Sequence, residues 1–216
     1  MTRGATFAVM ILALLAACGT AVDEESGLGQ SINAIAARTG EVQFVPRFAV
    51  LVEQGAPRLQ VAFVEKDLSA DILLERSVGA FDYWLSADGT QIIMQDGMLH
   101  STRGIGEGLL ASDLSEPLAR VRGLSPGTSD RFHTYLDGND RAVSRTYRCV
   151  IVDRGPREID LFGTPTATRL MRESCRSLDQ EFVNLYWVAP SSRDIILSRQ
   201  WSGPVIGAIS TRIVPR

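Results

Sequence analysis

Apolar and polar residues alternate along most of the chain after residue 40. Runs of this kind are Leu59–Phe63, Ile159–Leu161, the set Tyr147, Cys149 and Ile151, and the set Val183, Leu185 and Trp187. A period of two is typical of β-strands with one buried face. Turn-forming pairs separate these runs at Asp88-Gly89, Asp96-Gly97, Asp137-Gly138, Gly155-Pro156 and Gly203-Pro204. The pattern predicts short antiparallel strands joined by tight turns.

Two segments depart from this period. The segment 26–38 has an apolar stripe at helical spacing, with Ser26 to cap its start and Gly40 to end it. The segment 104–126 is rich in Gly, Ser and Leu, and we expect a short helix over 115–122 within it. No alternation of strands and helices indicates a doubly wound fold. We therefore predict one all-β domain over 41–216, an antiparallel barrel-like body or sandwich, preceded by a short N-terminal helix.

The first 17 residues have the features of a secretory leader. Arg3 is followed by an apolar stretch and then by Ala16-Ala17, which suit a cleavage site. The four residues Leu15 to Cys18 resemble a bacterial lipobox, whose cysteine is acylated with palmitate-type chains; an ordinary secretory cut is the alternative. We predict a signal peptide over 1–17, a lipid anchor on Cys18, and a lipidated tether with the short helix over 18–40. Gly19 follows the cysteine, which by this resemblance directs the protein to the outer membrane.

Composition and charge exclude several classes of protein. Charged residues make up 22% of the chain and aromatics 7%, which argues against disorder or a fibrous protein. The net charge of −3 offers no footprint for nucleic acid. Beyond the leader no apolar run approaches the ~20 residues of a spanning helix. With two histidines in all, a three-histidine zinc site is excluded, and we expect no cofactor or metal.

The remaining cysteines form one candidate pair. Of three cysteines, Cys18 is assigned to the lipid, which leaves Cys149 and Cys175. In an oxidising periplasm an isolated pair favours a disulfide over a metal site. Two separate buried thiols are the alternative.

Three short motifs suggest chemistry but fit turns better. The run 123–127 matches a hydrolase nucleophile elbow around Ser125, yet the next residue is Pro126, which has no N–H for an oxyanion. The glycines of 104–108 lack phosphate-loop spacing, so we interpret them as a flexible loop. The run 137–140 lacks the closing glutamate of a calcium loop, so we interpret it as a tight turn.

Carboxylates and tryptophans offer two further candidate sites. A glycosidase needs two carboxyl groups across a cleft, and Glu107, Asp113 and Glu116 lie in the irregular segment where loops often carry function. This alternative requires one of them to have a raised pKa. Trp84, Trp187 and Trp201 fall in strand-like runs. They either fill the core, which we favour, or contact a glycan or a partner.

Two blocks of residues carry a resemblance to a known family. The first comprises 83–89, 96–99 and 102–106, and the second comprises 173–175, 182–188 and 198–201. Together with the lipobox, they resemble the YjbF-type lipoproteins, also called group 4 capsule polysaccharide lipoproteins, over roughly residues 49–213. The resemblance implies a lipoprotein encoded with exopolysaccharide or capsule genes, an antiparallel barrel-like domain, and no established enzyme activity.

Arg199 lies in the second block. Alternation places it on the same face as Leu197 and Trp201, so we expect it to be partly buried and paired with Glu173 or Asp194.

The leading functional hypothesis is a non-enzymatic lipoprotein on the periplasmic face of the outer membrane. It would assist production or export of an extracellular or capsular polysaccharide by contacting outer-membrane export proteins or the polysaccharide itself. A periplasmic glycan hydrolase that uses the loop carboxylates, and a purely structural envelope lipoprotein, are the alternatives.

Overall fold

The computed structural model describes residues 45–106, 108–137, 139 and 141–215. The predicted signal peptide, Cys18, the tether and the helix over 26–38 lie outside this part of the chain. The described elements are, in order, α2 (Pro46–Glu53), β1 (Arg58–Phe63), η1 (Val64–Lys66), β2 (Leu68–Val78), β3 (Phe81–Leu85), β4 (Gln91–Gln95), β5 (Met98–Arg103), β6 (Leu109–Asp113), α3 (Ser115–Arg122), β7 (Gly127–Leu136), β8 (Ala142–Leu161), β9 (Thr164–Arg176), β10 (Glu181–Val188), β11 (Ile195–Gly203) and β12 (Gly207–Ile213).

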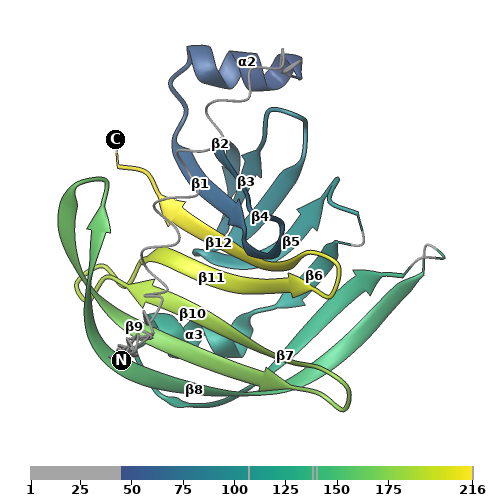
Figure 1. Ribbon diagram of the computed structural model, residues 1–216, viewed down its shortest axis with the longest axis vertical. Coiled ribbons are helices and arrows are strands. Elements are labelled where there is room, and N and C mark those ends of the chain that lie inside the picture. Colours follow the sequence, from purple (N-terminus) through teal and green to yellow (C-terminus); the bar gives the residue numbers. More distant parts are fainter. Residues whose placement is uncertain (1–44, 107, 138, 140, 216) are drawn as a thin grey trace, which may run out of the picture.

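The strands form one antiparallel sheet (Figure 1). Its twelve described strands follow the order β5-β4-β3-β2-β1-β12-β11-β10-β9-β8-β7-β6, so that the first and last of them in the sequence, β1 and β12, pair in the middle of the sheet. The sheet curls until its two edges meet, and His100 Nδ1 of β5 lies 2.9 Å from the carbonyl oxygen of Ser112 on β6. The predicted all-β antiparallel body is therefore confirmed, and it is a nearly closed barrel rather than a sandwich.

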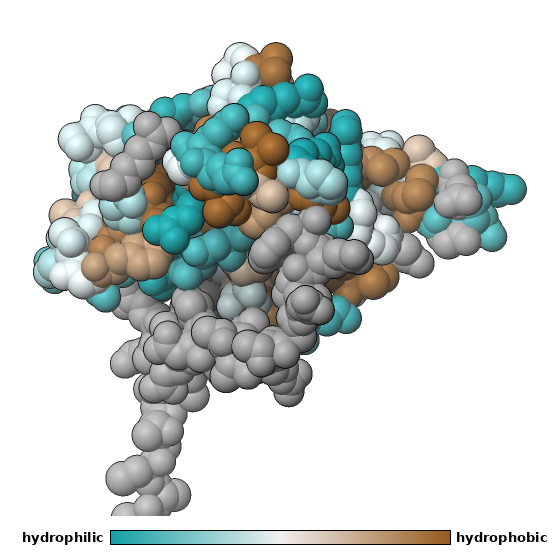
Figure 2. Space-filling model, turned by 90° about the horizontal axis from the view of Figure 1, so that it is seen from above, coloured by the Kyte–Doolittle hydropathy of each residue, from teal (hydrophilic) through white to brown (hydrophobic). Residues whose placement is uncertain are grey.

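Two short helices accompany the sheet in the described part of the chain. The predicted helix over 115–122 is α3, and Asp113 accepts hydrogen bonds from the N–H and hydroxyl of Ser115 at its start. Helix α2 corrects the prediction at the start of the all-β domain over 41–216, where no helix is expected. It starts at Pro46, packs Phe48 against the sheet and leaves Val50 49% exposed. Figure 2 looks onto the α2 end and shows apolar residues interspersed with hydrophilic ones. Neither helix is long and apolar enough to cross a membrane.

The alternation of apolar residues predicts the buried face of some strands but not of others. The set Tyr147, Cys149 and Ile151 is buried, as its alternation predicts. On β10, Val183, Leu185 and Trp187 share a face, but the more buried face is the other one, which carries Asn184 and Tyr186. Polar side chains enter this part of the barrel because they find partners there. The interior therefore divides into an apolar region lined by β1–β5 and a more polar region lined by β7–β11.

Candidate functional site

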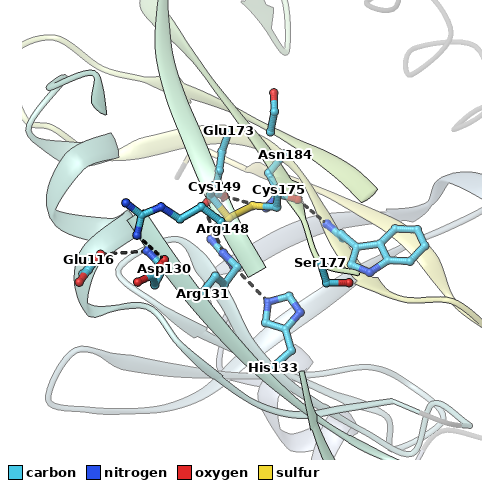
Figure 3. Close-up of a disulfide and its surroundings, with 12 residues drawn as sticks. Glu116, Asp130, Arg131, His133, Arg148, Cys149, Glu173, Cys175, Ser177 and Asn184 are labelled. Atoms are coloured by element: carbon cyan, nitrogen blue, oxygen red, sulfur yellow. Dashed lines mark hydrogen bonds and ion pairs between the residues drawn. A yellow bond between two sulfur atoms is a disulfide. The ribbon is translucent and has the colours of Figure 1, made fainter. Parts of the chain in front are cut away.

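A buried ion pair lies in the polar region (Figure 3). Arg131 of β7 and Glu173 of β9 are 1% and 0% exposed. Arg131 Nε donates to Glu173 Oε1 at 3.2 Å and Nη2 donates to Oε2 at 3.0 Å, so the contact is bidentate. Burial opposes the charge of Arg131, but the Glu173 carboxylate outweighs it and raises the arginine pKa. Arg131 therefore keeps its positive charge inside the barrel, where it is paired with Glu173.

Neutral side chains complete the coordination of this pair. The Tyr186 hydroxyl accepts from Arg131 Nη2 at 3.1 Å and donates to Glu173 Oε2 at 2.9 Å. Asn184 Nδ2 donates to the same carboxylate oxygen at 2.8 Å, and Asn184 Oδ1 accepts the N–H of Trp201 at 2.7 Å. Burying charges is tolerated when such bonds replace water. The network is saturated by its own members, and its arrangement is that of a structural core.

His133 extends the network along β7. Its Nε2 lies 3.5 Å from Arg131 Nη1, and its Nδ1 lies 2.7 Å from the Tyr135 hydroxyl. The ring stacks on Phe182 and is 0% exposed. Burial, and then the nearby Arg131 charge, lower the His133 pKa well below its ordinary value. The imidazole is therefore neutral and sealed from solvent.

The predicted disulfide is present beside the network. Cys149 of β8 and Cys175 of β9 are directly opposite in the ladder, with Cα atoms 4.0 Å apart, and they are bonded. With Glu173 they form the group of metal-ligand side chains found in the described residues. The disulfide occupies both sulfurs and Arg131 holds the carboxylate, so this group does not fit a metal ion.

Of the two partners predicted for Arg199, the structure excludes Glu173. Glu173 binds Arg131, and Asp194 binds Arg122 at 3.4 Å. The registers place Leu185 opposite Arg199 and Asn184 opposite Glu173, so Arg199 and Glu173 lie on opposite faces of the sheet. Arg199 is half-buried, as expected. Arg131 was not predicted as the partner of Glu173. A signal for it exists, because every second residue of β7 points inward: Ser129, Arg131, His133 and Tyr135 are all buried.

The three tryptophans lie in different surroundings. Trp187 is 8% exposed and packs against Ile159 and Leu197, so it fills the core. Trp84 is half-buried and lines a pocket of about 200 Å³ whose walls carry charged side chains. These charged residues are Asp82, Asp96, Arg122 and Asp194.

Trp201 lines a second surface pocket, of about 260 Å³. Its ring is half-buried and stacks on Phe182 with centroids 5.7 Å apart. Glu65, Glu181 and Arg199 line the same pocket. Two of the three predicted aromatic contacts thus combine a partly accessible ring with charged groups, whereas Trp187 does not.

The carboxylates of the hydrolase alternative serve the fold. The Ser115 N–H and hydroxyl lower the Asp113 pKa, the opposite of what a general acid requires. Glu116 accepts the N–H of Asp130 at 2.9 Å (Figure 3). Glu107 lies outside the described residues. Among the described residues, Asp113 and Glu116 therefore do not form a pair of catalytic acid and base.

The remaining motifs are turns, as predicted. Ser125 follows α3 and precedes β7, the reverse of the strand–serine–helix order of a nucleophile elbow. Gly104 and Gly106 adopt positive φ in the loop before β6. Asp137 Oδ1 accepts the N–H groups of Asn139 and Arg141, which closes the turn between β7 and β8.

Comparisons with known proteins agree with this geometry. A family model described as "Group 4 capsule polysaccharide lipoprotein gfcB, YjbF" matches residues 34–214. The crystal structure of the hypothetical lipoprotein YmcC from Escherichia coli (K12) matches with a TM-score of 0.66 and 15% sequence identity, over 88% of this chain and 94% of that chain. At this identity the structural match supports the fold alone. No curated protein matches the chain at a significant level. Because the family model covers most of the sequence, the chain belongs to the YjbF family of group 4 capsule polysaccharide lipoproteins.

Proposed function

We propose that the protein is a lipid-anchored outer-membrane lipoprotein that assists production or export of an extracellular or capsular polysaccharide and catalyses no reaction. The observation that carries this proposal is the family match over 34–214. The anchor is Cys18, and the body faces the periplasm. The family describes capsule polysaccharide lipoproteins, and the role in this chain rests on that membership.

The chemistry of the described residues supports a non-catalytic role. The buried titratable groups Arg131, Glu173 and His133 bind one another and lack contact with solvent. The Asp113 carboxylate is held ionised at a helix start. A glycosidase needs one protonated and one ionised carboxyl group facing a substrate. These residues do not provide that combination.

The pockets at Trp84 and Trp201 are the proposed contact sites for the polysaccharide or for an outer-membrane export protein. Each offers an aromatic surface on which a sugar ring can stack, with carboxylates and an arginine that can bind hydroxyl groups. Residue Trp187 is excluded because it lies in the core.

Deletion of the gene tests the proposal in cells. Under conditions that induce polysaccharide, the deletion strain is expected to show less surface polysaccharide, and the intact gene should restore it. Unchanged surface polysaccharide would refute a role in this process. Purified protein should leave the chain length of the polysaccharide unchanged; shortening would support the hydrolase instead.

Binding is tested by retention of the purified polysaccharide and of outer-membrane proteins on immobilised protein. Trp84→Ala and Trp201→Ala should each lower retention of the true ligand. Phe162→Ala is the matched control, because Phe162 is an aromatic residue, 48% exposed, at the far turn between β8 and β9. Equal retention by all three variants would exclude both pockets as contact sites.

A further inference from the structure

An apolar cavity of about 530 Å³ opens at one end of the barrel. Its walls come from the end of β1, the start of β2, and the turns that follow β3, β5 and β11, which all lie at the same end of the strands. The floor consists of buried apolar residues: Val61, Ile72, Ile92 and Ile206. The rim adds Phe63, Leu68 and Ile105, and Leu68 is 57% exposed. Its volume and lining are typical of sites for small apolar ligands.

The polar groups of the rim bind one another. The Ser86 hydroxyl donates to Asp88, and the Thr90 N–H donates to the same carboxylate at 3.0 Å. The hydrogen bond from the Ser86 hydroxyl has the largest effect, and together these bonds lower the Asp88 pKa. The carboxylate is therefore anionic at neutral pH. A sugar would need several free donors and acceptors on the walls. The lining instead fits an aliphatic chain, which needs apolar surface alone.

Lys66, the only lysine of the chain, stands at the mouth of this cavity. In the described part of the protein its ammonium group makes no hydrogen bond or ion pair. The turn that carries it is fixed by Glu65, whose carboxylate accepts the N–H of Ala208 at 2.7 Å. Gly207 leaves room for this contact, because a Cβ there would lie 2.2 Å from Glu65 Oε2. One lysine, Lys66, and one carboxylate, Asp88, thus border an apolar cavity.

The described part of the chain begins beside this cavity. The described chain begins at Val45, whose N–H donates to the carbonyl oxygen of Ala87 at 2.9 Å. Ala87 itself lines the cavity, and Cys18 precedes Val45 by 27 positions (45 minus 18). A protein anchored through Cys18 is held at a membrane, where phospholipids supply abundant acyl chains.

We propose that this cavity binds one acyl chain of a membrane phospholipid with a zwitterionic phosphoethanolamine head group. The chain lies on the floor formed by Val61, Ile72 and Ile206, the phosphate lies against Lys66, and the ammonium lies against Asp88. This inference rests on the proposed anchor at Cys18, but it goes beyond the proposed function because it requires no contact with polysaccharide.

Photo-crosslinking of the lipidated full-length protein tests the proposal. The protein is reconstituted into vesicles that contain phosphatidylethanolamine with a photoactivatable group in its acyl chain, and cross-linked peptides are mapped by mass spectrometry. Labels are expected on β1, β2 and the turn before β12. Ala70→Trp, which places a large side chain on the cavity wall, should lower labelling by about tenfold, or about 1.4 kcal/mol.

The controls separate a filled cavity from a damaged fold. Ala167→Trp is matched to Ala70→Trp, because both alanines are exposed on strands and Ala167 is not part of the cavity. It should label like the unmodified protein. Lys66→Gln, a surface change, should weaken labelling by phosphatidylethanolamine but not by a photoactivatable diacylglycerol, which has no phosphate. Labels outside the cavity walls, equal labelling of Ala70→Trp and Ala167→Trp, or labelling by the diacylglycerol alone would each overturn the proposal.

Discussion

Replacing Glu173 with Gln should destabilise the fold strongly, because it leaves the Arg131 guanidinium buried without a counter-charge. The two side chains are 0% and 2% exposed, so water does not replace the lost carboxylate. Removal of one partner of a buried ion pair costs about 3–5 kcal/mol. Domains typically have a free energy of unfolding of about 5–15 kcal/mol, so Glu173→Gln should remove a large part of it.

Removing both charges should cost less than removing one. The double variant Arg131→Met with Glu173→Met leaves no buried charge, and apolar replacements of buried pairs are often nearly neutral. The Tyr186 hydroxyl and Asn184 Nδ2 each lose a hydrogen bond in that variant, and the two bonds together contribute about 1–3 kcal/mol, less than the cost of the unpaired charge. We therefore expect partial recovery relative to Glu173→Gln.

Urea unfolding at pH 7, followed by tryptophan fluorescence with the disulfide intact, measures these free energies. Asp179→Asn is the matched control, because it breaks the exposed Arg145–Asp179 pair, which water screens, and should leave the free energy of unfolding nearly unchanged. The reasoning is refuted if Glu173→Gln costs no more than Asp179→Asn, or if the double variant is less stable than Glu173→Gln.

Three further changes test other parts of the fold by the same unfolding measurement. Reduction of the Cys149–Cys175 bond, which closes a separation of 26 residues, should cost about 3.5 kcal/mol, and a loss below about 1 kcal/mol would contradict it. Because the His133 pKa is lowered in the fold, the unfolded chain takes up the proton first as pH falls through about 6.5. Stability should fall as the pH drops from 7 to 5, and His133→Gln should remove that part of the slope. Gly207→Ala should cost about 1–3 kcal/mol, because Gly207 has φ +76° and its new Cβ would meet Glu65; an unchanged midpoint would argue against this turn geometry.

The strands and one helix could be predicted because their signals are local. The period of two predicted the strands, and the helix over 115–122 was predicted from a segment of only eight residues. Helix α2 is equally short but lies within an apolar stretch, where a helix and a buried strand have similar patterns. Closure of the barrel, and the pairing of β1 with β12, depend on contacts between distant segments that no local pattern records.

The candidate site was predictable only where few choices existed. Cys149 and Cys175 were the sole remaining cysteines, so their pairing followed by elimination once Cys18 was assigned to the lipid. Glu173 had many arginines as candidate partners, and Arg131 lies 42 residues away on a strand two positions along the sheet. Choosing between them required the register of β8 and β9, which the sequence does not contain.

The central claim is that the protein assists polysaccharide production without catalysis, and complementation of the deletion strain tests it most directly. The variant to express combines Glu107→Gln, Asp113→Asn and Glu116→Gln, which removes the candidate catalytic carboxylates while Asn keeps a side-chain oxygen at the start of α3. Surface polysaccharide is then measured under inducing conditions. The account predicts a low level with the empty vector and full recovery with the triple variant. A normal level with the empty vector, or no recovery by a folded triple variant, would contradict it.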